Sequence, residues 1–144
     1  MRTANTLSRA QVQLVLGKIP FFRDFSSDER ERVADEQNSF HIAREGEFII
    51  RQGTQERAFY LLLSGSCEIR VDGQDLVVAL LEPGDVFGEI GFLSEQPRTS
   101  HIVACQPSIL MRVDQALMTR FKAEIREKIK DQLIKKLLQR IDPQ

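Results

Sequence analysis

Apolar residues first recur along the chain with the spacing of a helix. The segment 8–16 predicts one short helix, and we expect Gly17 to end it and Ile19-Pro20 to force an extended step. A second helix is predicted from Ser26, because Ser26 and Glu29 have the spacing of a capping box, in which each side chain binds the backbone of the other residue. The front of the chain is therefore expected to be helical.

From Phe40 the apolar runs become short and are separated by turns that contain glycine, which is the pattern of strands. Five such turns follow one another: Glu45-Gly46, Gln52-Gly53, Ser64-Gly65, Asp72-Gly73 and Pro83-Gly84. Turns at this density predict an all-β roll or barrel. We expect Asp72-Gly73 to close a tight hairpin between strands at 67–71 and 76–81, since its turn type needs positive φ. Two more strands are expected at 101–105 and 109–113.

The chain returns to a helical pattern from Asp114, a suitable N-cap, to about Arg140. The apolar residues of this segment stand four apart: Leu117, Phe121, Ile125, Ile129, Leu133, Leu137 and Ile141. A four-residue repeat drifts around a straight helix of about 3.6 residues per turn, so two helices with a bend at 123–126 are expected. The roll pattern offers this stripe no partner, so we expect part of it to be exposed without a ligand.

Composition indicates the class of protein and its expected location in the cell. With 144 residues, 42% of them hydrophobic, the chain can enclose a core without a metal or a disulfide framework. Neither a membrane-spanning run nor a secretory signal is recognisable, so the expected location is the cytoplasm. Cys67 and Cys105 are expected to be reduced and buried, because a single pair is no disulfide framework.

Charge is unevenly distributed. Through Asp114 the chain has twelve Lys or Arg against seventeen Asp or Glu, whereas the last thirty residues have eight against four. These basic residues alternate with apolar ones at helical spacing. We therefore interpret them as a solvated helix face, and direct binding of nucleic acid is not expected.

The segment 85–98 interrupts the strands and contains the residues that are the best candidates for binding a ligand. A strand is expected to end at Phe87, and Gly88 allows close backbone approach at the start of a short helical turn, where free N–H groups attract an anion. Arg98 would supply the countercharge and a two-pronged hydrogen bond to phosphate oxygens. Glu89 would repel a phosphate, so it is expected to accept a hydrogen bond from a hydroxyl of the same ligand, as acidic residues do with ribose.

The stretch FGEIGFLSEQPRTSHIVA at 87–104 resembles the phosphate-binding cassette of the cyclic-nucleotide-binding domain family. That family includes kinase regulatory subunits, gated channels and the bacterial catabolite activator protein. The resemblance extends to IPFF at 19–22 and to FYLLLSG at 59–65, and it implies an α+β, mainly β fold. The implied fold is an eight-stranded β-roll (jelly roll) with short N-terminal helices and C-terminal hinge and lid helices. The expected organisation is one domain, 1–144, with N-terminal helices at 1–37, a roll at 38–113 that holds the cassette at 86–100, and helices at 114–144.

Carried over position by position, the resemblance implies that Arg98 binds the phosphate of a cyclic nucleotide and that Glu89 binds its ribose. The positions that would offer backbone or hydroxyl contacts are Gly88, Ile90, Thr99 and Ser100. The implied base wall consists of Cys67, Ala79 and Val86 or Phe87. The ligand is cAMP or cGMP, and no cofactor or metal is expected. The hydroxyl of Thr99 favours cGMP without deciding between the two ligands, and cAMP, the commoner ligand of bacterial-type members, is slightly preferred.

Nothing in the sequence supports catalysis. His41 and His101 lie apart in strand segments, and no serine has the surroundings of a nucleophile. The expected function is a sensor or regulatory domain that relays ligand occupancy through its C-terminal helix to a protein effector or a second copy. The alternatives are a ligand-free interaction or dimerisation module, in which Arg98 and Glu89 form an ordinary ion pair, and a fragment of a larger transcription factor, channel or kinase-like regulator.

Overall fold

The computed structural model describes residues 1–4 and 7–141. Its strands are β1 (Arg2–Thr3), β2 (Phe40–Ala43), β3 (Phe48–Ile50), β4 (Ala58–Ser64), β5 (Cys67–Arg70), β6 (Ala79–Leu81), β7 (Val86–Phe87), β8 (His101–Ala104) and β9 (Ser108–Asp114). Its helices are α1 (Arg9–Lys18), α2 (Ser27–Ala34), α3 (Glu89–Leu93), α4 (Gln115–Arg120) and α5 (Ala123–Ile141), with 3-10 turns η1 (Pro20–Phe22) and η2 (Gln37–Ser39).

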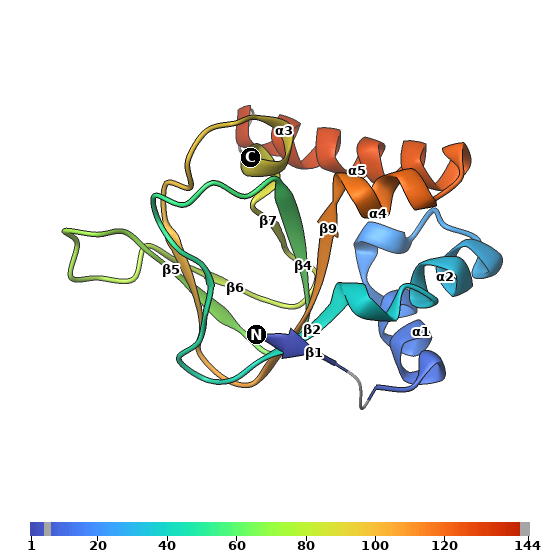
Figure 1. Ribbon diagram of the computed structural model, residues 1–144, viewed down its shortest axis with the longest axis horizontal. Helices are drawn as coiled ribbons and strands as arrows, with labels where there is room; N and C mark the ends of the chain where they lie inside the picture. The colour runs from blue at the N-terminus through green and yellow to red at the C-terminus, as the bar shows by residue number, and fades with distance from the viewer. Residues whose placement is uncertain (5–6, 142–144) are drawn as a thin grey trace.

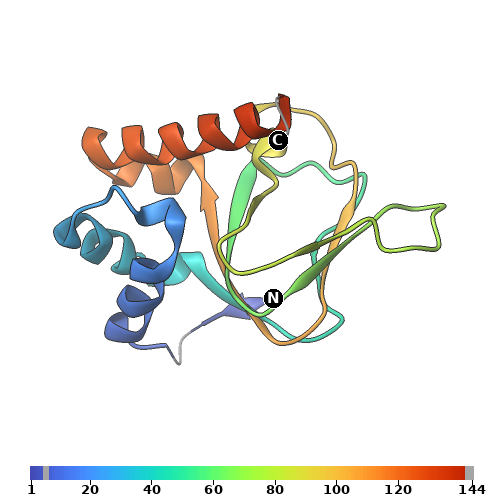
Figure 2. The same ribbon diagram turned by 180° about the vertical axis from the view of Figure 1, so that it is seen from behind.

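The strands form two antiparallel sheets. The first has the order β1-β2-β9-β4-β7 and the second the order β3-β8-β5-β6. The N-terminal helices and α4 lie on one side of the first sheet, and α5 runs across the end of the molecule from α4 towards α3 (Figures 1 and 2). This is the mainly β roll that the sequence predicts, with nine strands among the described residues where eight were expected; the two-residue β1 was not anticipated. In the described part of the chain, no helix is long and apolar enough to cross a membrane.

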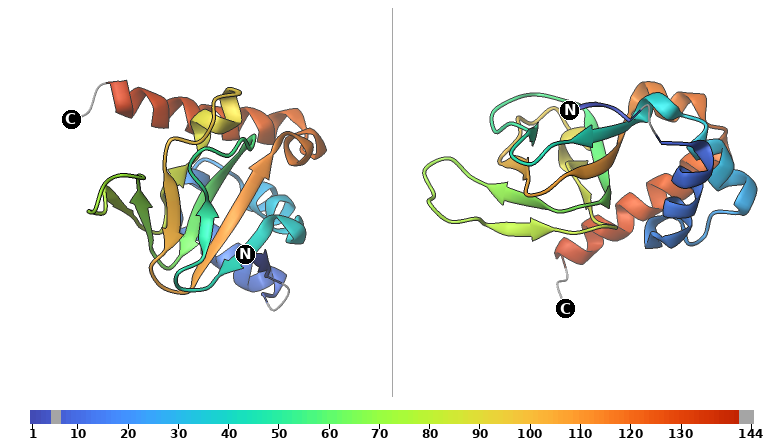
Figure 3. Two further views of the ribbon diagram at one scale, coloured as in Figure 1. Left: turned by 60° about the vertical axis from the view of Figure 1, so that its left-hand side comes forward. Right: turned by 90° about the horizontal axis from the view of Figure 1, so that it is seen from below.

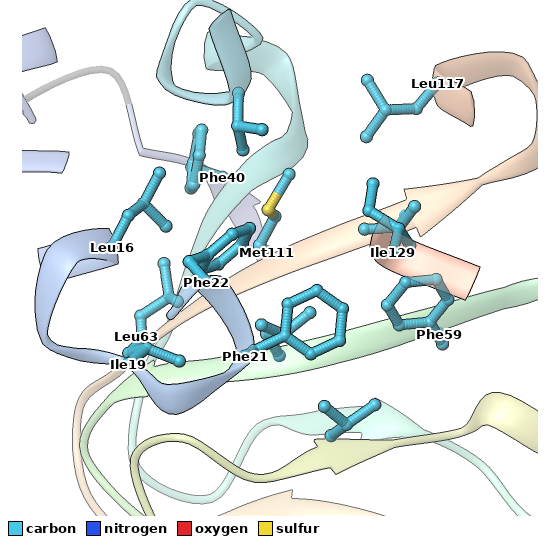
Figure 4. Packing of buried hydrophobic residues seen from close by; sticks show 14 of the residues in the cluster. Leu16, Ile19, Phe21, Phe22, Phe40, Phe59, Leu63, Met111, Leu117 and Ile129 are labelled. Atoms are coloured by element: carbon cyan, nitrogen blue, oxygen red, sulfur yellow. The ribbon is translucent and has the colours of Figure 1, made fainter. Parts of the chain in front are cut away.

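Strand β4 separates two hydrophobic cores. Side chains alternate across a strand, so Phe59, Leu61 and Leu63 join the core under the helices. Tyr60 and Leu62 join the core between the two sheets. Both faces of β4 are therefore buried, which accounts for its unbroken apolar sequence. Figure 4 shows the core under the helices, where side chains from α1 and η1 meet those of the first sheet.

The ends of the N-terminal helices follow from local chemistry. Ser26 caps α2 as predicted: its hydroxyl accepts a hydrogen bond from the Glu29 N–H at 3.1 Å, and the Glu29 carboxylate accepts one from the Ser26 N–H at 2.7 Å. The prediction that Gly17 ends the first helix is wrong, because α1 continues to Lys18. The residue before a proline avoids the helical region, so Pro20 sets the end of α1.

The hairpin expected at Asp72-Gly73 forms, because β5 pairs antiparallel with β6, but the prediction that it is tight is wrong. These residues do turn the chain, with Gly73 at φ 85°, but β6 begins only at Ala79. The carboxylate of Asp72 accepts a hydrogen bond from His101 at 2.7 Å, and its N–H donates one to Gln52 Oε1 at 2.8 Å. These contacts to neighbouring segments hold the turn in place and leave residues 71–78 as a longer connection.

The C-terminal segment forms two helices, as predicted, and Asp114 caps α4 by accepting a hydrogen bond from the Leu117 N–H at 2.9 Å. The break between them falls at 121–122, just before the expected bend at 123–126. The expectation of an exposed stripe is wrong for most of its members. The buried members are Leu117, Phe121, Ile125, Ile129 and Leu133, which pack in the core under the helices. Leu137 is half-buried, and Ile141 lies outside the described side chains. The stripe packs against the N-terminal helices and the outer face of the first sheet, which the strand pattern in the sequence did not reveal as its partners.

Candidate functional site

A cavity of about 250 Å³ lies between α3 and the start of β8. The predicted site residues that line it are Phe87, Gly88, Glu89, Ile90, Arg98, Thr99 and Ser100. Lining residues that sequence reasoning missed are Ile50, Ile69, Gly91, Gln96, Pro97 and Ile102. The cassette that was recognised in the sequence therefore forms most of the wall of one cavity.

Two glycines shape the floor of this cavity. Gly88 caps α3 with φ 78°, a conformation that side chains with a Cβ rarely adopt. At Gly91 an added Cβ would lie 2.1 Å from Nη1 of Arg98, so the guanidinium rests directly against the α3 backbone. The absence of side chains at these two positions makes the room that Arg98 occupies.

Arg98 is buried and is held from several directions. Its backbone N–H donates to the carbonyl of Thr54 at 2.8 Å, and its carbonyl accepts from the Gly53 N–H at 2.8 Å. The guanidinium donates to the carbonyls of Gly88 at 2.8 Å and Ala58 at 2.6 Å. Its buried Nε has no hydrogen-bond partner among the residues that the structure describes. A fixed cation with a remaining donor, set in a cavity wall, fits an anionic group of a ligand.

The guanidinium also forms an ion pair with Glu56, Nη2 to Oε1, at 3.3 Å. The other carboxylate oxygen of Glu56 accepts hydrogen bonds from Tyr60 at 2.8 Å and from Nε of Arg112 at 2.9 Å. Arg112 in turn donates to Asp114, the cap of α4, at 2.9 Å. A continuous chain of charged contacts therefore links the cavity wall to the start of the C-terminal helices.

The ionisation states in this network follow from the contacts. Burial raises the pKa of the Tyr60 hydroxyl above its usual value, and the nearby Glu56 carboxylate adds to the effect. Burial alone would lower the pKa of Arg112, but the hydrogen bond with Glu56, the charges of Tyr60 and Glu56 and the hydrogen bond with Asp114 together outweigh it and raise the pKa. For Asp114, burial works against the charged form, while hydrogen bonds from the Leu117 N–H and Arg112 lower the pKa below its ordinary value. Arg112 and Asp114 are thus both charged near neutral pH.

Glu89 is the first residue of α3 and its side chain is fully buried. It reaches the cavity from the same short helix that Arg98 rests against. Phe92 anchors that helix from below by packing edge-on against Phe59 of β4, with ring centroids 5.1 Å apart. A guanidinium and a carboxylate in one wall suit a ligand that has both an anionic group and a hydroxyl donor.

The expected base wall is only partly formed. Phe87 lines the cavity, whereas Val86, one residue before it, points to the other side of its strand and packs under the helices. Cys67 is buried between the sheets, and Ala79 is exposed on β6, where it pairs with the cavity residue Ile69. Alternation along β5 and β8 could have found Ile69 and Ile102, which stand two residues after Cys67 and Ser100.

The remaining singled-out residues have structural environments. His101 accepts a hydrogen bond from the Gln52 N–H at Nδ1, 3.0 Å, and so presents a proton to Asp72 at Nε2. Both cysteines are free: Cys67 is buried, which raises the pKa of its thiol to about 11, while Cys105 is only partly buried because it follows the end of β8. Within residues 1–4 and 7–141, no three His, Cys, Asp or Glu side chains gather as a metal site requires.

Comparison with known proteins gives a consistent result. The family described as "Cyclic nucleotide-binding domain" matches residues 41–124. A cAMP-dependent protein kinase regulatory subunit of Yarrowia lipolytica is 37% identical over 89 residues, which is 62% of this chain and 24% of that protein. A cGMP-dependent protein kinase of Caenorhabditis elegans is 31% identical over 104 residues, 69% of this chain and 13% of that protein.

The fold has close counterparts among solved structures. A cyclic nucleotide-binding domain from Methylobacillus flagellatus superposes with a TM-score of 0.74 at 18% identity, covering 92% of this chain and 78% of that one. At this identity the likeness shows the fold. The chain spans a quarter or less of the length of the two kinase relatives.

Proposed function

The chain belongs to the cyclic nucleotide-binding domain family, and from this membership we propose that it binds cAMP or cGMP in the cavity beside α3. Its proposed role is to signal the presence of the nucleotide to another protein, not to catalyse a reaction. The observation that carries the proposal is Arg98, which lines the cavity with a buried guanidinium that backbone carbonyls fix and whose Nε has no hydrogen-bond partner among the described residues.

In the proposed complex each part of the nucleotide meets a group suited to it. Arg98 binds the phosphate, with backbone N–H groups at Gly88 and Ile90 and the hydroxyl of Ser100 as further donors. Glu89 accepts the hydrogen bond of a ribose hydroxyl. The base lies against Phe87 and the β5–β6 wall, where Ile69 and Ala79 are paired. Thr99, an exposed residue, lines the same cavity.

The proposed signal leaves the site through the charged contacts that begin at Glu56. A phosphate on Arg98 adds a second anion beside the guanidinium that Glu56 holds, and Glu56 also pairs with Arg112. Arg112 also binds Asp114, the N-cap of α4, so a change at Glu56 alters how α4 is held. Two arrangements of the C-terminal helices then have different affinities for the nucleotide. The coupling can be no larger than that difference in affinity.

The proposed output surface is the exposed end of α5, which contacts a protein effector or a second copy. Direct binding of nucleic acid is not part of the proposal. We place the protein in the cytoplasm, which its similarity to kinase regulatory subunits and its two free cysteines support.

Calorimetric titration of the whole chain with cAMP and cGMP tests the proposal. Arg98→Ala should raise the Kd of the nucleotide roughly a hundredfold or more, because it removes the counterion of a buried phosphate. Arg44→Ala, at an exposed arginine in the turn before β3, is the matched control and should leave the Kd unchanged. Wild-type affinity in Arg98→Ala would contradict the assignment of the phosphate site.

The rival function is a roll that binds no ligand and acts only in protein contacts. The internal bonds of Arg98 to Glu56, Ala58 and Gly88 favour it, since they would also satisfy an arginine with a purely structural role. The same titration separates the two functions. Absence of heat from either nucleotide, with a folded wild-type chain, would establish the rival.

A further inference from the structure

The connection between β5 and β6 is an exposed apolar projection. Every side chain from Asp72 to Leu80 is exposed, and Leu76 and Leu80 retain 82% and 63% of their accessible surface. Figures 1 and 3 show this segment extending away from the body on the side opposite the N-terminal helices. We call residues 71–80 the arm. The arm returns into β6, which is the edge strand of its sheet.

The arm has a defined conformation. The contacts of Asp72 with His101 and Gln52 fix its first turn to the body. The N–H of Val78 donates to the Ile69 carbonyl at 2.8 Å and fixes its return. An ordered projection that exposes several large apolar side chains is the signature of a surface that another molecule covers.

Charge restricts what that molecule can be. The arm contains two acidic residues, Asp72 and Asp75, and no Lys or Arg. Two arms placed against each other would bring acidic side chains together, which opposes pairing of the β6 edges. A surface that is both apolar and basic therefore suits the arm best.

The chain itself presents such a surface on α5. Ile134 and Leu138, one helical turn apart, retain 53% and 56% of their accessible surface. They lie in the segment 130–138, which contains three lysines (Lys130, Lys135 and Lys136) and one acidic residue (Asp131). We call the exposed face of 130–138 the helix patch. Because the arm and the patch remain exposed in the same molecule, neither covers the other within one chain.

We propose that two copies of this chain associate with the arm of each on the helix patch of the other. One two-fold axis forms both contacts at once, and each joins an acidic apolar surface to a basic apolar one. The inference rests on the proposal that α5 makes the partner contact, and it is independent of nucleotide binding. Because arm and patch are already ordered, association requires little reorganisation.

Sedimentation velocity of the whole chain over a wide concentration range, without nucleotide, tests the dimer. Wild type should sediment as a dimer at high concentration. Leu76→Glu in the arm and Ile134→Glu in the patch should each raise the dimer Kd about tenfold or more. Leu14→Glu is the matched control, because Leu14 on α1 is similarly exposed, at 69%, and lies in neither surface.

Charge reversal tests the pairing itself. Asp75→Lys and Lys135→Glu should each weaken the dimer, and the double variant should recover most of the affinity. A monomer at every concentration would overturn the proposal. So would a dimer that Ile134→Glu weakens but Leu76→Glu does not, which indicates helix on helix, or one that Asp75→Lys strengthens, which indicates arm on arm. Titration of Leu76→Glu with cAMP shows separately whether the nucleotide site is intact.

Discussion

The carboxylate of Glu56 lies 3.3 Å from Nη2 of Arg98, so the arginine assigned to the phosphate is already paired inside the protein. The pairing joins residues 42 positions apart, because the loop before β4 passes beside the cassette. Glu56 also accepts a hydrogen bond from Arg112 on β9. One side chain thus holds the guanidinium in position and connects it to the strand that leads into α4.

Glu56→Gln should weaken nucleotide binding severalfold, less than Arg98→Ala does. The two arginines contact different oxygens of Glu56, so the amide meets one of them with its oxygen and the other with its NH2 donor, and without the negative charge the support of Arg98 weakens. The free energy of unfolding should fall by about 1 kcal/mol, the size of one hydrogen bond to a partly exposed charge. Calorimetry and urea unfolding measure the two effects. Glu45→Gln, at an exposed acid in the turn before β3, is the control, and equal results for both variants would remove Glu56 from the site.

Glu89→Gln should weaken cAMP binding by on the order of 1–3 kcal/mol, because a neutral amide is a poorer acceptor for a ribose hydroxyl. Titration with 2′-deoxy-cAMP isolates that hydroxyl. Wild type should lose affinity for the deoxy ligand, and Glu89→Gln should lose little more, since both changes remove the same contact. Additive losses would show that Glu89 acts elsewhere in the site.

Thr99→Ala should lower affinity for cGMP more than for cAMP. Thr99 is an exposed residue that lines the cavity, and only guanine has an exocyclic amine at C2 for its hydroxyl, since adenine has a hydrogen at that position. The expected difference between the two nucleotides is about 1 kcal/mol, one neutral hydrogen bond. Parallel titrations of wild type and variant measure it. Equal losses for both nucleotides would exclude Thr99 as a selectivity residue.

The cassette could be predicted from the sequence because its function depends on local order. Gly88 turns the chain, and Glu89 and Arg98 follow at fixed places on one short helix and its loop, so a linear pattern preserves their relationship. Contacts between distant segments leave no such pattern. Two such contacts are the ion pair of Glu56 with Arg98 and the hydrogen bond of His101 with Asp72. Both depend on which strands become neighbours in the fold.

The C-terminal stripe illustrates the same limit. Its four-residue spacing predicts helices that bury one face, and the break near Phe121 follows from the drift of that spacing. The spacing does not specify the neighbour. In the fold, η1 brings Phe21 and Phe22 against the outer face of the first sheet, and this surface receives the stripe that the roll pattern left unpartnered.

Stability should decrease on the acid side through Glu29. The hydrogen bond from Lys128 on α5, followed by that from the Ser26 N–H, lowers the pKa of Glu29 below its usual 4.5. A carboxyl with a lowered folded-state pKa stabilises the fold above its unfolded value and loses that contribution as pH falls through the folded one. Glu29→Gln should therefore be less stable than wild type at pH 7, and the difference should shrink below about pH 4.5. Urea unfolding at several pH values measures this, and a difference that does not change with pH would contradict it.

Leu133→Ala should lower the free energy of unfolding of the nucleotide-free chain by about 2–5 kcal/mol, the range for a buried leucine whose removal leaves a cavity. Leu133 is buried in the core under the helices, together with Ile129 and Phe92, although no nucleotide is bound. Leu138→Ala on the same helix is the control, because Leu138 is exposed and its truncation should change stability by less than about 0.5 kcal/mol. Urea unfolding of the three proteins gives both values. If α5 instead detaches from the rest of the protein when nucleotide is absent, Leu133 is not buried in the folded state. Leu133→Ala and Leu138→Ala should then have the same free energy of unfolding.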